Sequence, residues 1–469
     1  MSVLSLAPTS DSEATGQVSM SQMFEKARAA QKEFEETADQ ALVDAAVRAL
    51  GQVVYNRAEE LAQMAVDESG MGVYTDKVAK CKGKSKTIWN SLKGKKSVGI
   101  IEVDEAAGII KVAKPKGVVG AVTPVTNPVV TPLCNSMFAL KGKNAIIITP
   151  HPRAAKVNKY VIDLFRAELK KLGLPEDLIQ TVERPSLDIT KQVMQNADVV
   201  VATGGAAMVK AAYASGKPAF GVGPGNVPVI VDRGIDYDRA AADIIAGRMF
   251  DNGIICSGEQ SLIAPKDDFD QIIRAFEKNG AFYIEDPEQV QKFADTIFPD
   301  GGAISRDVVG QSVQQIAAMA GVEVPQDTKI ILLKARGVGR EDVLCKEKMC
   351  PVMVAIPYDT FDEAMSIARS NLFYEGKGHT AAIHSANDEN IRRVGEVLPV
   401  SRVVVNQPSS TGAGGNLMNG FSPTTTLGCG SWGNNSISEN LNFTHLINVS
   451  QIGLRNEGPI PTDEAIWAE

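Results

Sequence analysis

Short, nearly continuous runs of branched apolar residues recur along this chain, and segments with helical spacing separate them. The first such runs are NAIIIT (144–149), IQTVE (179–183), ADVVVAT (197–203) and VPVIVD (227–232). Strands that lack polar alternation are typically buried on both faces, and strands joined through helices run parallel. The pattern therefore predicts an α/β domain of nucleotide-binding type, with a parallel sheet covered by helices.

The same alternation continues in a second α/β segment, which opens with a helix over 236–250. Its expected strands are SLIAP (261–265), KIILL (329–333), VMVAIP (352–357), TAAIH (380–384) and SRVVVN (401–406). Ahead of the first sheet we expect helices over 21–34, 41–66 and 75–92, the second interrupted at Gly51, and then a β-hairpin over 98–119. The stretch 408–435 is rich in Gly, Ser, Thr and Asn, which is typical of a loop that lines a site.

Composition excludes several classes of protein. A length of 469 residues suggests two to four domains at about 100–200 residues each. Lys and Arg number 48 against 56 Asp and Glu, and a net charge of -8 argues against a nucleic-acid binder. No apolar run reaches the roughly 20 residues that a membrane span needs. The six cysteines form no CxxC pair, so we expect free thiols and no metal site.

The first 18 residues carry neither a basic start nor an apolar core, so they do not look like a secretory signal. Their polar composition predicts a disordered tail. We therefore expect a cytoplasmic protein.

One cysteine stands out from the others by its surroundings. Cys256 lies in FDNGIICSGEQ (250–260), between Gly253 and Gly258, and glycines let a backbone approach a ligand closely. This cysteine is either a nucleophile whose own amide stabilises an oxyanion, or a buried structural thiol.

The glycine and lysine patterns are less specific. No GxGxxG follows a strand and opens a helix, and GVGPG (221–225) precedes a strand instead. ATGG (202–205) does stand between a strand and a helix, where its amides could face a pyrophosphate or simply form a tight turn. The lysines within 77–86 form either a solvated face or a wall that attracts anions.

Several segments, taken in order, resemble the aldehyde dehydrogenase superfamily, and within it the CoA-acylating branch. They are TPVTNP (123–128), ATGG with GVGPGN (202–205 and 221–226), NGIICSGEQS (252–261), KEKMCPV (346–352) and LGCGSWGNNSISENL (427–441). The resemblance covers about residues 20–455. It implies a homodimer or homotetramer built from two α/β domains and a β-hairpin oligomerisation element.

The resemblance also implies site residues and domain limits. Cys256 would be the nucleophile, Asn127 the oxyanion donor and Glu347 a ligand of the nicotinamide ribose. The other expected cofactor-binding residues are Thr123, Pro124, Thr149, His151, Arg153, Thr203, Gly204, Gly205, Gly223, Gly225 and Met349. The expected domains are cofactor-binding over 19–97 and 118–235 and catalytic over 236–427, with oligomerisation elements over 98–117 and 428–469.

Two departures from the family pattern are informative. Water-using members place a general-base Glu where this chain has Val222, and without that base thioester transfer to CoA is favoured over hydrolysis. NAD-selective members often place a Glu after the strand at 144–149, whereas this chain reads TPHPRA (149–154). His151 and Arg153 could accept a 2′-phosphate, so both NADP and NAD are expected, or Arg153 is surface charge.

Among family members, the chain looks most like CoA-acylating succinate-semialdehyde dehydrogenases. Acylating sulfoacetaldehyde, acetaldehyde and propionaldehyde dehydrogenases are alternatives. An anionic aldehyde needs a cation, and Lys84 or Arg402 could supply it, unless either is ordinary surface charge. His379 either takes the CoA thiol proton or is structural.

Two other functions stay open. One is a non-catalytic assembly component, and the other is an enzyme that phosphorylates or hydrolyses its acyl intermediate. A separate question is location, because some acylating relatives enter a bacterial microcompartment through an added amphipathic helix. Residues 1–18 show no such helix, so encapsulation is unsupported but stays open.

Overall fold

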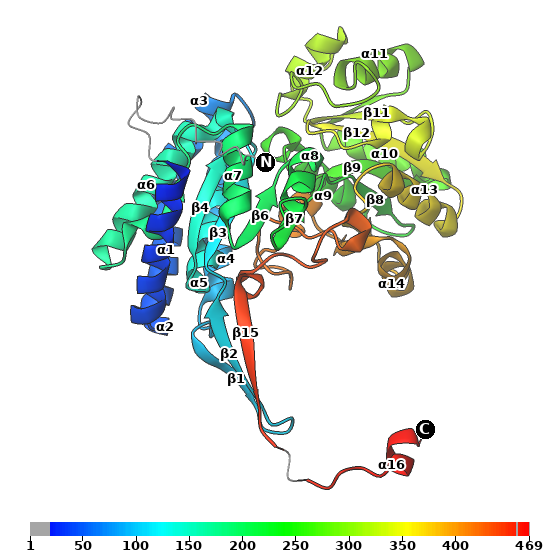
Figure 1. Cartoon of the computed structure of the whole chain (residues 1–469). Coiled ribbons are helices and arrows are strands. Elements are labelled where there is room, and N and C mark those ends of the chain that lie inside the picture. Colours follow the sequence, from blue (N-terminus) through cyan, green and yellow to red (C-terminus); the bar gives the residue numbers. More distant parts are fainter. Residues whose placement is uncertain (1–18, 456–457, 469) are drawn as a thin grey trace, which may run out of the picture.

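The computed structural model describes residues 19–455 and 458–468, so the tail predicted for 1–18 lies outside the described part. Two helix-covered parallel sheets make up the body, and a narrow three-stranded arm projects from it (Figure 1). Both expected α/β units are therefore present.

The first sheet is parallel throughout. In spatial order its strands are β5 (Ile179–Thr181), β4 (Ala145–Pro150), β3 (Val118–Thr123), β6 (Val199–Thr203) and β7 (Ala219–Val222). Strand β7 was not expected, because its four residues give too short a pattern. Almost every residue of β3, β4 and β6 is buried, as the apolar runs predict.

Helices cover this sheet, and α1 to α4 precede it in the chain. They are α1 (Met20–Thr37), α2 (Gln40–Asn56), α3 (Ala58–Ser69), α4 (Tyr74–Leu92), α5 (Val130–Lys141), α6 (Ala155–Lys171), α7 (Leu187–Asn196) and α8 (Ala206–Tyr213). The helix predicted over 41–66 is indeed divided, but at Arg57 and not at Gly51. Gly51 lies inside α2, where a Cβ would be in ordinary contact, at 3.5 Å, with the carbonyl oxygen of Ser85.

The second sheet has seven parallel strands. Their spatial order is β10 (Ala281–Ile284), β11 (Ile330–Lys334), β12 (Val352–Tyr358), β9 (Glu259–Pro265), β8 (Val227–Val231), β13 (Gly378–His384) and β14 (Val400–Val405). Strand β8 lies within the predicted limits of the cofactor-binding domain, 118–235, but it pairs with β9 and β13 of this second sheet. A local apolar run does not reveal which sheet it joins.

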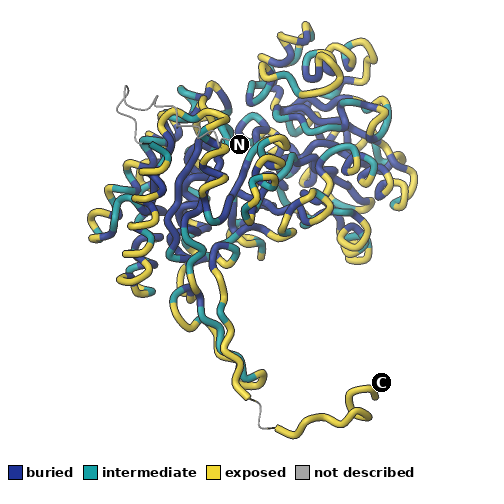
Figure 2. Tube along the Cα trace, in the orientation of Figure 1, coloured by how far each residue is buried: buried dark blue, intermediate teal, exposed yellow. Residues whose placement is uncertain are grey.

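The strands of the second sheet are mostly buried (Figure 2). Ile331 and Leu333 of β11 belong to one apolar cluster, whereas Ile330 and Leu332 belong to another, as expected where side chains alternate between two covered faces. The covering helices are α9 (Tyr237–Met249), α10 (Phe269–Lys278), α11 (Pro287–Ile297), α12 (Val313–Ala320), α13 (Phe361–Tyr374) and α14 (Asp388–Val397), followed by the short α15 (Ser409–Gly412).

Short 3₁₀ turns punctuate the loops. They are η1 (Pro152–Ala154), η2 (Glu176–Leu178), η3 (Phe250–Gly253), η4 (Lys266–Asp268), η5 (Gly339–Glu341), η6 (Val343–Cys345), η7 (Ser431–Gly433) and η8 (Phe443–Leu446). The turn η3 lies directly ahead of the segment that holds Cys256.

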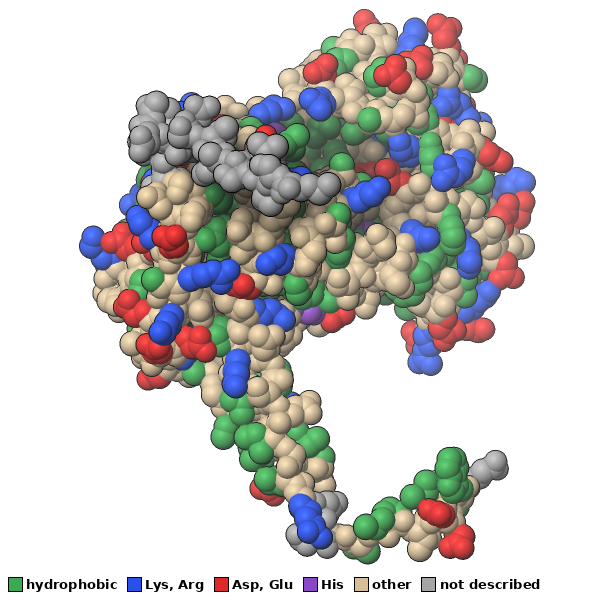
Figure 3. Space-filling model, viewed as in Figure 1, with side chains coloured by type: hydrophobic (Ala, Val, Ile, Leu, Met, Phe, Trp, Pro, Cys, Tyr) green, Lys and Arg blue, Asp and Glu red, His purple; other side chains and the backbone are tan. Residues whose placement is uncertain are grey.

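The predicted hairpin is present and gains a third strand from the end of the chain. Strand β1 (Gly99–Asp104) pairs with β2 (Ile109–Pro115), and β2 pairs with β15 (Ile447–Gly453), both antiparallel. Residues 118–119, predicted as part of the hairpin, instead begin β3. Hydrophobic side chains are exposed along this arm, among them Val103, Val449 and Ile452 (Figure 3).

After the arm the chain ends in the exposed helix α16 (Asp463–Trp467). Among the described residues, no helix is both long enough and apolar enough to cross a membrane.

Candidate active site

A cavity of about 550 Å³ lies between the two sheets. On one side it meets the carboxyl ends of parallel strands, because Thr123, Thr203 and Val222 are the last residues of β3, β6 and β7. On the other side, Cys256 precedes β9 and Glu347 precedes β12. Ligands of α/β proteins commonly bind beyond the carboxyl ends of the strands, and a volume of this size suits a small-molecule site.

Most of the residues predicted for the site line this cavity. They are Thr123, Pro124, Asn127, His151, Thr203, Gly204, Gly205, Gly223, Cys256, Glu347 and Met349. The residues of that prediction that do not line it are Lys84, Thr149, Arg153, Gly225, His379 and Arg402. The structure thus brings together segments that are more than 200 positions apart in the sequence.

Cys256 lies in a tight turn, in which the amide of Gly258 donates to the carbonyl oxygen of Ile255 at 2.9 Å. Cys256 as a whole residue is partly exposed, whereas the other cysteines are buried, but its thiol group itself lies in buried surroundings. Burial first, and then the nearby carboxylate of Glu347, raise the pKa of the Cys256 thiol to about 12, against a lowering by Arg402. The thiol is therefore protonated at neutral pH in this state, and its proton must leave before or during attack.

Glu347 forms hydrogen bonds with two segments that are distant from it in the sequence. Its Oε1 accepts a hydrogen bond from the amide of Gly225 at 3.0 Å, and its own amide donates to the carboxylate of Glu375 at 2.8 Å. Burial and then the Glu375 charge raise the pKa of Glu347 to about 8. Among the described residues that line the cavity, Glu347 is the one with an acidic side chain. Val222 also lines the cavity, and its apolar side chain cannot act as a general base.

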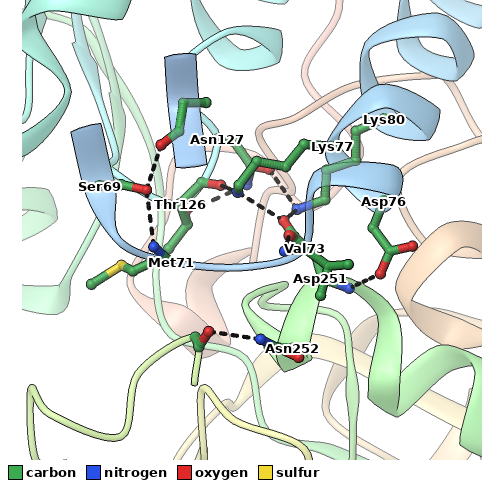
Figure 4. Close-up of polar contacts among 12 residues, drawn as sticks. Ser69, Met71, Val73, Asp76, Lys77, Lys80, Thr126, Asn127, Asp251 and Asn252 are labelled. Atoms are coloured by element: carbon green, nitrogen blue, oxygen red, sulfur yellow. Dashed lines mark hydrogen bonds and ion pairs between the residues drawn. The ribbon is translucent and has the colours of Figure 1, made fainter. Parts of the chain in front are cut away.

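Asn127 follows β3 and lines the same cavity as Cys256. Its Oδ1 accepts a hydrogen bond from Nζ of Lys80 at 3.0 Å, and among the described residues its Nδ2 reaches only Oγ1 of Thr126, at 3.5 Å (Figure 4). An amide nitrogen with so little competition can donate to a new acceptor in the cavity.

The cavity wall also fits a nucleotide. A Cβ added to Gly205 would meet nothing within 4 Å, and one added to Gly204 would meet only Met208, at 3.9 Å, so there is open space above this turn. The hydroxyl of Thr123 is buried and has no hydrogen-bond partner among the described residues, although Thr123 lines the cavity. A ribose or phosphate oxygen would satisfy it.

The two residues predicted to distinguish NADP from NAD, His151 and Arg153, are joined by one hydrogen bond. Nδ1 of His151 accepts a hydrogen bond from the amide of Arg153 at 3.1 Å, and the Arg153 guanidinium donates to the carbonyl oxygen of Ser69. Burial and then the charge of Arg153 lower the pKa of His151, so the ring is neutral at pH 7. Only His151 of this pair lines the cavity.

Neither predicted cation for the substrate is ordinary surface charge. Nζ of Lys84 donates to the carbonyl oxygens of Gly414 at 2.8 Å and Thr424 at 3.1 Å, which ties α4 to the glycine-rich loop. Arg402 is buried and donates through Nη2 to the carbonyl oxygens of Gly428 and Ser438. Its Nη1 has no partner among the described residues.

His379 is also buried, with Nδ1 2.9 Å from the hydroxyl of Thr380. Burial first, and then the charge of Arg402, lower its pKa to about 3. Its Nε2 lacks a hydrogen-bond partner among the described residues. The ring is therefore neutral and holds one unused nitrogen.

Only part of the lysine-rich stretch 77–86 is a solvated face. Lys77 and Lys80 point inward and pair with Asp251, a residue that the sequence analysis missed. Lys82, by contrast, pairs with Glu59 on the surface. The available signal for Asp251 was its place five positions before Cys256 in FDNGIIC.

The fold and the site define a class of protein. A profile described as the aldehyde dehydrogenase family matches residues 7–292, and the chain belongs to that family.

Individual relatives narrow this class. The succinate-semialdehyde dehydrogenase (acetylating) of Clostridium kluyveri is 61% identical over 454 residues, which cover 97% of this chain and all of that protein. The sulfoacetaldehyde dehydrogenase (acylating) of Bilophila wadsworthia is 38% identical over 458 residues, covering 96% of this chain and 98% of that protein.

Solved structures agree with this assignment. An acetylating aldehyde dehydrogenase from Geobacillus thermoglucosidasius has a TM-score of 0.90 at 35% identity, covering 94% of this chain and 97% of that one. Propionaldehyde dehydrogenase of Rhodopseudomonas palustris, solved with bound propionyl-CoA, has a TM-score of 0.83 at 30% identity, covering 93% and 94%. The predicted fold, of the acylating branch of the family, is confirmed.

Proposed function

We propose that this protein is a CoA-acylating aldehyde dehydrogenase that interconverts succinate semialdehyde and succinyl-CoA. The observation that carries the proposal is that one cavity is lined by Cys256, Asn127 and Glu347, with Val222 where a hydrolytic base would stand. The identity to the Clostridium kluyveri protein supports the choice of aldehyde.

The first half of the reaction makes a thioester on the enzyme. Cys256 Sγ attacks the aldehyde carbon after losing its proton, and the product is a thiohemiacetal. Nδ2 of Asn127 and the amide of Cys256 donate to the oxygen that becomes negative, and one such donor is worth about 2.7–4 kcal/mol of barrier. NAD(P)⁺ supplies the hydride acceptor when it is bound. Residues Thr123, Gly204, Gly205 and Glu347 would hold it, together with His151 beside the adenosine ribose.

The second half passes the acyl group to CoA. Water would need a general base, and the cavity wall offers Val222 where water-using members carry one, whereas the CoA thiol is far more acidic than water. His379 is buried outside the cavity lining, and we propose that its Nε2, which has no hydrogen-bond partner among the described residues, accepts a hydrogen bond from that thiol when CoA binds. We therefore assign His379 to the acyl-transfer half and not to hydride transfer.

The guanidinium group of Arg402 could bind an anionic substrate. Nη1 of Arg402 lacks a partner among the described residues, and this guanidinium is close enough to lower the pKa of Cys256. The distal carboxylate of succinate semialdehyde, or the sulfonate of sulfoacetaldehyde, would pair with it. Lys84 is the weaker candidate because loop carbonyl oxygens already occupy its ammonium group.

Steady-state kinetics test the proposal most simply. Succinate semialdehyde, sulfoacetaldehyde and propionaldehyde are each assayed with NAD or NADP, with and without CoA. We expect the highest kcat/KM for succinate semialdehyde, and turnover that requires CoA. A preference for propionaldehyde would exclude the anionic site, and turnover with phosphate or water alone would exclude acyl transfer to CoA. No reduction of either dinucleotide would favour a non-catalytic assembly component.

We further propose that the arm of β1, β2 and β15 joins copies of the chain into a homodimer or homotetramer. The support is its row of exposed apolar side chains, which a partner copy would cover. Sedimentation of the purified protein tests this, and a monomer would contradict it. The cytoplasmic location stays a prediction.

A further inference from the structure

Two lysines on α4 converge on a single buried carboxylate. Nζ of Lys77 lies 3.0 Å from Oδ2 of Asp251, and Nζ of Lys80 bonds the same oxygen (Figure 4). Lys77 and Lys80 are one helical turn apart, so both side chains leave the same face of α4. Asp251 precedes the nucleophile Cys256 by five positions. The cluster therefore links α4, which packs against α2, α3 and α5, to the segment that carries the nucleophile.

Asp251 itself is rigidly held. Its backbone has φ 53°, its Oδ1 accepts from the amide of Val73 at 2.7 Å, and its own amide donates to Oδ2 of Asp76 at 2.7 Å. Burial alone would raise the pKa of Asp251, but the two ammonium groups and the Val73 amide outweigh it, so the pKa lies below its ordinary value. The carboxylate is charged, and it fixes where Lys77 and Lys80 can lie.

Only one of the two lysines reaches the oxyanion donor. Nζ of Lys80 also donates to Oδ1 of Asn127 at 3.0 Å, whereas the other contact of Lys77 is the backbone carbonyl of Thr126, at 3.4 Å. An ammonium group donates and never accepts, so only the oxygen end of the Asn127 amide can face Lys80. The nitrogen end is then directed away from Lys80 and stays free to donate.

We infer that Lys80 is a positioning residue for catalysis: anchored by Asp251, it holds Oδ1 of Asn127 and so orients Nδ2 to donate to the oxyanion. This inference rests on the oxyanion role proposed above for Asn127. Without Lys80 the amide would be free to rotate, and it would lose part of its preorganisation toward the developing charge.

Lys77 provides a matched control, because it shares the Asp251 contact but does not touch the Asn127 side chain. We expect Lys80→Met to lower kcat about tenfold, with KM for aldehyde and for NAD(P)⁺ changed less than about threefold. Lys77→Met should lower the unfolding temperature by a similar amount but leave kcat within about threefold. Equal losses of kcat in the two variants would overturn the inference in favour of a merely structural clamp.

A double-mutant cycle separates this inference from the role of Asn127. In an Asn127→Ala background, Lys80→Met should lower kcat less than about twofold further, because there is no amide left to orient. A full tenfold loss in that background would overturn the inference. If Asn127→Ala alone keeps the wild-type kcat, the oxyanion role fails and the inference falls with it. Should Lys80→Met not fold, Lys80→Gln, which keeps an N–H donor, is measured in the same cycle.

Discussion

The backbone of Gly225 lies directly against the carbonyl group of Cys256. A Cβ on residue 225 would stand 1.6 Å from the carbonyl oxygen of Cys256. The backbone amide of Gly225 also donates a hydrogen bond to Oε1 of Glu347. Gly225 therefore sets both the turn that carries the nucleophile and the position of the proposed ribose ligand.

Gly225→Ala should displace the Cys256 turn and abolish most of the activity. Overpacking against backbone typically costs about 1–3 kcal/mol, so the unfolding temperature should fall as well. Gly223→Ala in the same loop is the control, because its Cβ would meet nothing within 4 Å. The control should keep its unfolding temperature, even if its KM for the cofactor rises. Full activity of Gly225→Ala would contradict the described contact.

Val222→Glu should introduce hydrolysis of the acyl-enzyme to the free acid, since it restores a base at the cavity wall. The product ratio of free acid to acyl-CoA, measured by chromatography, reports the change. Val222→Gln has a similar volume but no basic carboxylate, so it should hydrolyse no faster than the wild type. If Val222→Glu makes only acyl-CoA, or if Val222→Gln hydrolyses the acyl-enzyme equally well, the absence of a base at position 222 does not explain the preference for CoA.

The ligand-free enzyme should react slowly with iodoacetamide at neutral pH. Because burial raises the pKa of Cys256 to about 12, the alkylation rate should still rise about tenfold per pH unit beyond pH 9, where an ordinary thiol levels off. Cys256→Ala is the control, since the other cysteines are buried. A plateau near pH 9 would show that the thiol is not desolvated as described.

His379→Ala should separate the two halves of the reaction. The first turnover, seen as a burst of NAD(P)H, should keep its rate, whereas steady-state turnover with CoA should slow about tenfold. Rapid mixing with absorbance detection measures both phases. A burst that slows as much as the steady state would indicate that His379 supports the structure of the site instead of the acyl-transfer half.

Local patterns predicted most strands of the two parallel sheets and singled out the segment around Cys256, whereas the segments around Asn127 and Glu347 were identified only through the family resemblance. The strands and the Cys256 segment depend on residues close together in the sequence, such as the apolar run of β4 and the glycines that flank Cys256. The resemblance to a family supplied the roles that spacing alone left open.

Features that depend on distant partners could not be predicted. Strand β8 has the same apolar pattern as β6, and only its pairing with β9 and β13 assigns it to the second sheet. The inward turn of Lys77 and Lys80 depends on Asp251, more than 170 positions away. In a sequence, a run of lysines looks like a solvated helix face. Which of the lysines are buried can be recognised only once the position of their carboxylate partner is known.

Mass spectrometry of the enzyme after a single half-reaction decides whether Cys256 carries the acyl group. The protein is mixed with succinyl-CoA in the absence of reduced cofactor, freed of small molecules, incubated with CoA or with buffer alone, and then digested. We expect a succinyl group on Cys256 that CoA removes rapidly and water removes slowly, and no such group on Cys256→Ala. An acyl group on another residue, or an unmodified Cys256, would contradict the role of Cys256 as the nucleophile.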